Sequence, residues 1–243
     1  VIWHMGRLAA FDIETTGTET EADRIVTAAV TIVGAGVDRV SMTWLVDPGV
    51  PIPAEATKVH RITDERVRKE GLPSEQAVAE ITEYLADIVC EGIPLVAFNA
   101  RFDLTILDRE ARRHGQETLS QMIEGNLPLR VIDPYVLDRH FNRFRKGRRT
   151  LSVLCDAYGI PLDDAHAADA DALAAVRLAW KLGDTQAELA GYDLDELHRA
   201  QVGWAKSQAE SLEKYFAEQG RPERIEGEWP LVSHEQQDPV SLP

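Results

Sequence analysis

The stretch "AAFDIETTG", residues 9–17, decides the fold, because two acids interrupt an apolar run that has the pattern of a buried strand. Side chains alternate across a strand, so Asp12 and Glu14 point to one face while Phe11 and Ile13 point to the other. Two carboxylates held this close raise each other's pKa and destabilise the fold unless a cation or a shared proton compensates. The stretch therefore predicts a strand whose acidic face has such a partner.

Length, charge and hydropathy limit the class of protein. The chain has 243 residues, enough to bury a complete core as one domain. Its formal net charge of -15 argues against wrapping duplex nucleic acid, which requires many neutralised phosphates, but not against gripping one strand end. No apolar run of about 18 residues and no secretory signal is visible, so we expect no membrane association and a cytoplasmic location.

Hydrophobic patterns along the chain predict an α/β fold. Residues 8–13, 24–34 and 40–48 are strand-like and joined by short turns, which favours a three-strand antiparallel meander. A strand over 93–100 lies between helices expected from residue 74 and from residue 101, and this order is typical of crossover connections to parallel strands. We therefore expect a mixed sheet flanked by helices.

The same patterns divide the chain into four parts. Residues 1–6 are interpreted as an N-terminal extension outside the fold, and residues 7–185 as the main domain. Residues 186–219 form a helical extension, with a long helix over roughly 193–219. Residues 220–243 lack periodicity, so we expect a loosely ordered tail.

Further acids follow two other predicted elements. Asp103, in "NARFD", lies in the first turn of a helix, where an acid also simply complements the helix dipole. "HAADAD" contains His166, Asp169 and Asp171 at the start of an apolar helix. The two aspartates lie about 200° apart on that helix, and periodicity does not choose between them.

"FDIETTG", "NARFD" and "HAADAD" resemble, in order and separation, the three motifs of the DEDDh 3′-to-5′ exonucleases, typified by the proofreading epsilon subunit of bacterial replicative DNA polymerase. The resemblance covers roughly residues 7–185, and the chain as a whole is similar to stand-alone actinobacterial members of the family. The family spacing H-x4-D selects Asp171. The resemblance implies an RNase H-like fold. In this fold Asp12, Glu14, Asp103 and Asp171 bind two Mg²⁺ or Mn²⁺ ions, and His166 is the general base.

Substrate contacts are predicted less directly. The candidates are Thr15, Thr16, His60, Asn99, Phe102, Arg145 and Lys146. For the two threonines a role in the turn is an equal alternative, and for Phe102 a place in the core. Arg145 and Lys146 belong to the basic run "RFRKGRR", residues 143–149, which is either a solvated surface or a loop that contacts phosphates.

The resulting functional prediction is a metal-dependent enzyme that hydrolyses single-stranded DNA from its 3′ end and releases nucleoside 5′-monophosphates. An exoribonuclease is the alternative within the same chemistry, because no residue is assigned to read a 2′-hydroxyl. A catalytically silent interaction module is the alternative from another class, and a DNA polymerase is a further candidate partner. A glycosidase with Asp12 and Glu14 as its acid pair leaves Asp103, His166 and Asp171 unexplained.

Overall fold

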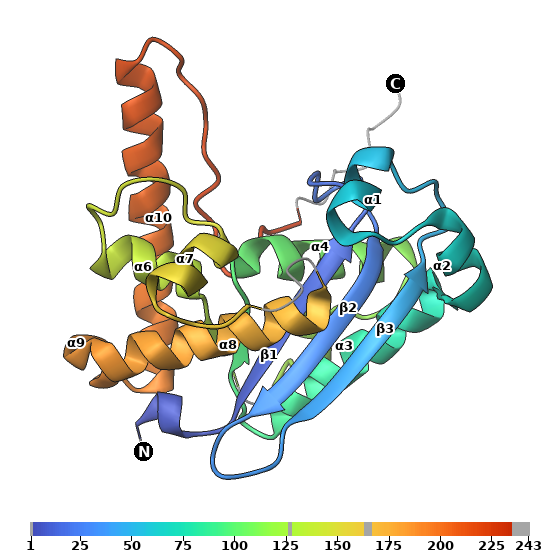
Figure 1. Cartoon of the computed structure of the whole chain (residues 1–243), viewed down its shortest axis with the longest axis horizontal. Helices are drawn as coiled ribbons and strands as arrows, with labels where there is room; N and C mark the ends of the chain where they lie inside the picture. Colours follow the sequence, from blue (N-terminus) through green and yellow to red (C-terminus); the bar gives the residue numbers. More distant parts are fainter. Residues whose placement is uncertain (1, 126–127, 163–166, 235–243) are drawn as a thin grey trace.

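The structure is a computed structural model that describes residues 2–125, 128–162 and 167–234. A six-stranded sheet in the order β4-β3-β2-β1-β5-β6 forms its centre (Figure 1). Its strands are β1 (Leu8–Thr15), β2 (Ile25–Val33), β3 (Val40–Asp47), β4 (Leu72–Pro73), β5 (Leu95–Val96) and β6 (Val131–Ile132). The first three form an antiparallel meander, and β5 and β6 extend it in parallel from β1. This arrangement confirms the predicted mixed α/β sheet.

Helices cover both faces of the sheet (Figure 1). Helix α8 (Ala168–Thr185) packs on one face, and α3 (Ser74–Cys90) and α4 (Ala100–Arg113) pack on the other. Strand β1 alternates between the two cores: Leu8 and Ala10 pack on the α8 side, whereas Phe11 and Ile13 pack on the α3 side. Continuing the alternation places Asp12 and Glu14 on the α8 side, where the apolar residues of β1 give way to acids.

The remaining helices surround this central unit. They are η1 (Trp3–Met5), α1 (Ala54–His60), α2 (Asp64–Glu70), α5 (Leu119–Met122), α6 (Pro134–Phe141), α7 (Leu151–Ala157), α9 (Ala187–Ala190) and α10 (Leu194–Glu218). Asp193 starts α10 with a capping box, in which it accepts the Glu196 backbone N–H while the Glu196 side chain accepts its own. The long final helix thus begins and ends within a residue of its expected bounds.

Both ends of the described chain are packed more closely than the sequence suggested. Trp3, in the segment interpreted as an extension, is buried, and its indole N–H donates to the Leu189 carbonyl at 2.9 Å. At the other end, Gly220 adopts φ 73°, and the chain turns back along α10 toward α4 (Figure 1). Trp229 in this returning segment is buried, whereas residues 220–224 are exposed.

Within residues 2–125, 128–162 and 167–234, no helix has both the length and the apolar character needed to cross a bilayer.

Candidate active site

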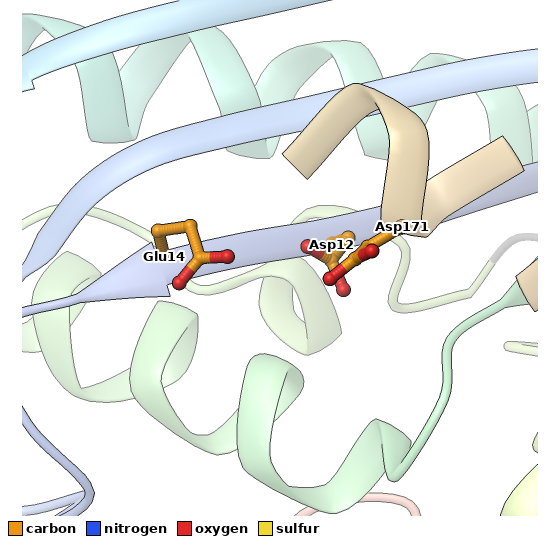
Figure 2. Close-up of side chains that lie close together, drawn as sticks. All are labelled: Asp12, Glu14 and Asp171. Atoms are coloured by element: carbon orange, nitrogen blue, oxygen red, sulfur yellow. The ribbon is translucent and has the colours of Figure 1, made fainter. Parts of the chain in front are cut away.

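Three carboxylates meet where β1 passes the start of α8. Oxygens of Asp12, Glu14 and Asp171 lie within 4.8 Å of one another. Figure 2 shows Asp12 and Glu14 projecting from the same side of β1 while Asp171 reaches them from the helix. The predicted pairing of the strand acids and their convergence with Asp171 are therefore present in the folded chain.

The burial pattern of α8 explains why Asp171, and not Asp169, reaches the sheet. Asp171 precedes Ala175, Leu178 and Leu182 at spacings of four, three and four residues, and all three of these are buried. Asp171 therefore lies at the N-terminal end of the stripe that packs on the sheet. Asp169 is exposed, although it also lines the rim of the neighbouring cleft.

Asp103 approaches β1 from its edge. Along β1, strand β5 pairs only with Ala9 and Ala10, so among the described residues the edge of β1 beyond them has no strand partner on this side. The Ile13 backbone N–H donates instead to Asp103 Oδ1 at 3.1 Å. Asp103 is buried and is not one of the three residues in the 4.8 Å group, but its charge acts on Asp12 at close range.

Burial and mutual repulsion raise the pKa values of these acids. Burial, followed by the charges of Asp103, Asp171 and Glu14, holds the pKa of Asp12 well above its usual range. Burial and the Asp171 charge raise the pKa of Glu14 to about 7. Burial also raises the pKa of Asp103, against the lowering effect of the Ile13 N–H. Such a group of hard oxygen donors fits a divalent cation, which would remove the repulsion.

A cleft of about 390 Å³ opens beside the acids. Glu14 lies at one side of it, and His60, Arg61 and Arg66 line another. His60 is buried, its Nδ1 accepts the Ile62 backbone N–H at 3.1 Å, and burial lowers its pKa. The structure thus places the predicted substrate residue His60 in the same cleft as Glu14.

The threonines after β1 make hydrogen bonds within the turn. The Thr15 hydroxyl donates to the Gly17 carbonyl at 2.6 Å, and the Thr16 hydroxyl donates to Asp23 at 2.7 Å. The Thr16 backbone N–H also donates to the Arg24 carbonyl. These contacts correspond to the turn role that the sequence left open, and the substrate role of the two threonines stays a prediction.

Two further candidates lie at the start of α4. Asn99 is the residue before the helix and adopts φ 64°, a left-handed conformation that asparagine tolerates better than most side chains. Phe102 is half-buried: part of its side chain packs against the core on the α3 side and part is accessible. Both residues lie within four positions of Asp103.

The basic run is partly directed into the protein. Asp138 is completely buried, and its carboxylate accepts hydrogen bonds from Arg145 and Arg149, with nitrogen–oxygen distances of 3.0 Å in each ion pair. The Arg145 guanidinium is therefore bound to a buried carboxylate, and its predicted contact with substrate stays a prediction. Lys146 is exposed, and so is Phe144, at 90% of its surface.

Sequence reasoning missed Asp133, a buried residue between β6 and α6. Its carboxylate accepts the backbone N–H groups of Asn99, Ala100 and Tyr135 and the indole N–H of Trp229, at 2.9–3.1 Å. The dipeptide Asp133–Pro134 is a helix-start signal and could have revealed the cap on α6. No local signal reveals its bonds to α4.

The predicted base His166 lies outside the described residues.

Similarity to known proteins identifies the family of the chain. The family model described as exonuclease, RNase T, matches residues 9–179, a range that contains all four acids. The chain belongs to this exonuclease family. The match confirms the resemblance to DEDDh-type exonucleases that the three motifs indicated.

PolC-type DNA polymerases III of two bacteria contain a segment similar to this chain. PolC-type DNA polymerase III of Streptococcus thermophilus is 33% identical over 170 residues, which are 70% of this chain and 11% of that protein. The corresponding protein of Lacticaseibacillus paracasei is 29% identical over 181 residues, 74% of this chain and 12% of that one. The chain therefore spans only about a tenth of the length of these curated relatives.

Solved structures agree on the fold. The crystal structure of E. coli Exonuclease I in complex with a dT13 oligonucleotide matches with a TM-score of 0.64 and 20% identity, covering 76% of this chain and 42% of that one. Exonuclease I from Methylocaldum szegediense matches with a TM-score of 0.62 and 21% identity, covering 76% and 42%. These likenesses confirm the RNase H-like α/β fold.

Proposed function

We propose that this protein is a metal-dependent exonuclease that removes nucleoside 5′-monophosphates from the 3′ end of single-stranded DNA. The observation that carries the proposal is the meeting of Asp12, Glu14 and Asp171 within 4.8 Å, beside Asp103, in a domain of the exonuclease family. Buried carboxylates that repel one another destabilise a fold unless a bound cation compensates their charge. With that cation in place, the site can also accept an anionic substrate.

The four acids would hold two Mg²⁺ or Mn²⁺ ions, which suit oxygen ligands better than Zn²⁺ does. When bound, such ions activate a water and stabilise the leaving oxygen of the phosphodiester. His166 would take the proton of that water, because an unperturbed imidazole titrates near neutral pH. The choice of metal and the role of His166 are both parts of the proposal.

The DNA end would enter through the cleft that Glu14 and His60 line. His60, Asn99 and Phe102 are proposed to contact the terminal nucleotide. In the basic loop we assign the phosphate contact to Lys146, because Arg145 is paired with Asp138. The likeness to Exonuclease I bound to oligonucleotides supports single-stranded DNA as the polymer, and a DNA polymerase remains a proposed partner from the PolC-type relatives.

A time course on 5′-labelled single-stranded DNA and RNA of equal sequence tests this function. The protein is assayed with Mg²⁺, with Mn²⁺ and with chelator, beside Asp12→Ala. A metal-dependent ladder on DNA that Asp12→Ala abolishes is the expected result. Faster degradation of RNA would favour the exoribonuclease alternative, and no ladder on either polymer would favour a silent binding module.

A further inference from the structure

The returning segment after α10 makes a regular set of contacts with α4. We define the C-terminal strap as residues 225–233. The Arg101 guanidinium donates to the Glu226 carbonyl, and the Val232 backbone N–H donates to the Thr105 hydroxyl at 3.0 Å. Arg109 donates to the carbonyls of Val232 and Ser233 at 3.1 and 3.3 Å. Positions 101, 105 and 109 are spaced by four, so the strap follows one face of α4 over about two turns.

The strap also reaches the turn that begins α4. The Trp229 indole N–H donates to Asp133 Oδ2 at 3.1 Å, and the same oxygen accepts the Ala100 backbone N–H at 3.0 Å. The other oxygen accepts the Asn99 backbone N–H at 2.9 Å. Trp229 and Asp133 are both buried, so water does not replace a lost partner easily.

These contacts lead directly to an acid of the candidate active site. Asp103 lies on the first turn of α4, three residues after Ala100, and its carboxylate meets the Ile13 N–H at the unpaired edge of β1. The strap and Asp133 hold the start of this helix through the Trp229 indole, the Ala100 N–H and the Asn99 N–H.

We propose that the C-terminal strap positions Asp103 for metal binding, with Trp229 and Thr105 as positioning residues. The strap holds the outer face of α4, and through Asp133 it fixes the β5–α4 turn, so that Asp103 stays at the edge of β1. This inference rests on the proposed function for its metal, but the position of Asp103 is measurable without metal.

Two substitutions weaken the strap at separate points. Trp229→Phe keeps a buried aromatic ring and removes the N–H that Asp133 accepts. Thr105→Val keeps the side-chain volume and removes the acceptor of the Val232 N–H. Trp3→Phe is the matched control, because Trp3 is also buried and also donates one N–H, but to Leu189, which lies in α9.

Each full-length variant is examined for thermal stability, for Mn²⁺ affinity by calorimetry, and for hydrogen exchange of the Ile13 amide in the metal-free protein. Both strap variants should raise the Kd for Mn²⁺ about tenfold, the lower end of the range for residues that orient metal ligands. They should also speed Ile13 exchange, because its acceptor is Asp103. The control should lose similar thermal stability and leave both quantities unchanged.

The outcomes separate the two proposals. If the strap variants match Trp3→Phe in both Mn²⁺ affinity and Ile13 exchange, the strap only stabilises the fold and the inference is overturned. If the unmodified protein binds no Mn²⁺, the proposed function fails. In that case Ile13 exchange in the strap variants still decides whether the strap positions Asp103.

Discussion

Replacing Glu14 by glutamine should stabilise the metal-free protein at pH 8. Burial and the charge of Asp171 raise the Glu14 pKa from 4.5 to about 7 in the folded protein. Below pH 4.5 the carboxyl is protonated whether the chain is folded or not, and its environment costs no stability. As the pH rises through 7 the folded protein must hold it ionised, so stability falls over this window.

The magnitude follows from the size of the pKa change. Each pKa unit corresponds to about 1.36 kcal/mol, so the whole change corresponds to about 3 kcal/mol. Glu14 is partly exposed, and solvent screening reduces the figure to about 2 kcal/mol. Glu14→Gln should therefore raise the melting temperature by about 4–8 °C at pH 8 in chelator, for a domain of this size. Near pH 4.5 the two proteins should melt together.

Thermal unfolding at pH 4.5, 6 and 8, with chelator and with Mn²⁺, measures the effect. Mn²⁺ should stabilise the unmodified protein more than Glu14→Gln, because the substitution removes a ligand charge. Asp169→Asn is the control: Asp169 is exposed in the first turn of α8, where a negative charge is favourable, so its loss should not stabilise the fold. A Glu14→Gln protein no more stable than the unmodified one at pH 8 would refute the argument that the acids repel one another.

Three further predictions follow from the same geometry. Asp171→Asn should lower the rate of DNA hydrolysis by more than about 100-fold, because losing a metal ligand costs more than the 10–100-fold typical of residues that only orient metal ligands. Asp169→Asn should keep a nearly normal rate in the ladder assay. Lys146→Glu should weaken single-stranded DNA binding and flatten its salt dependence, while the Mn²⁺ affinity measured by calorimetry stays constant. DNA binding equal to that of the unmodified protein would mean that the loop is a solvated surface that does not contact DNA. Asp138→Ala leaves Arg145 half-buried without its partner and should cost about 3–5 kcal/mol in urea unfolding, so a cost below about 1 kcal/mol would contradict the ion-pair argument.

Local sequence patterns were sufficient to predict the acids at the centre of the candidate site. The alternation of β1 placed Asp12 and Glu14 on one face, and motif spacing selected Asp171, because both signals lie within a few residues of the acid concerned. Contacts between distant segments left no such signal. Asp133 accepts N–H groups from residues 34 and 96 positions away, and the segment that contains Trp229 has no periodicity. The direction of Arg145 was equally hidden, since a basic run looks the same whether its side chains face solvent or a buried acid.

The distribution of the candidate site along the chain has a consequence for the cell. Its acids come from residues 12, 14, 103 and 171, and the strap adds residues up to 233. Loops of this length close late, because chain entropy opposes bringing such distant segments together. A half-synthesised or partly unfolded chain would therefore carry the acids without assembling them. Under the proposed function, hydrolysis would then begin only when nearly the whole described chain is in place, and immature copies of the protein would leave nucleic acid intact.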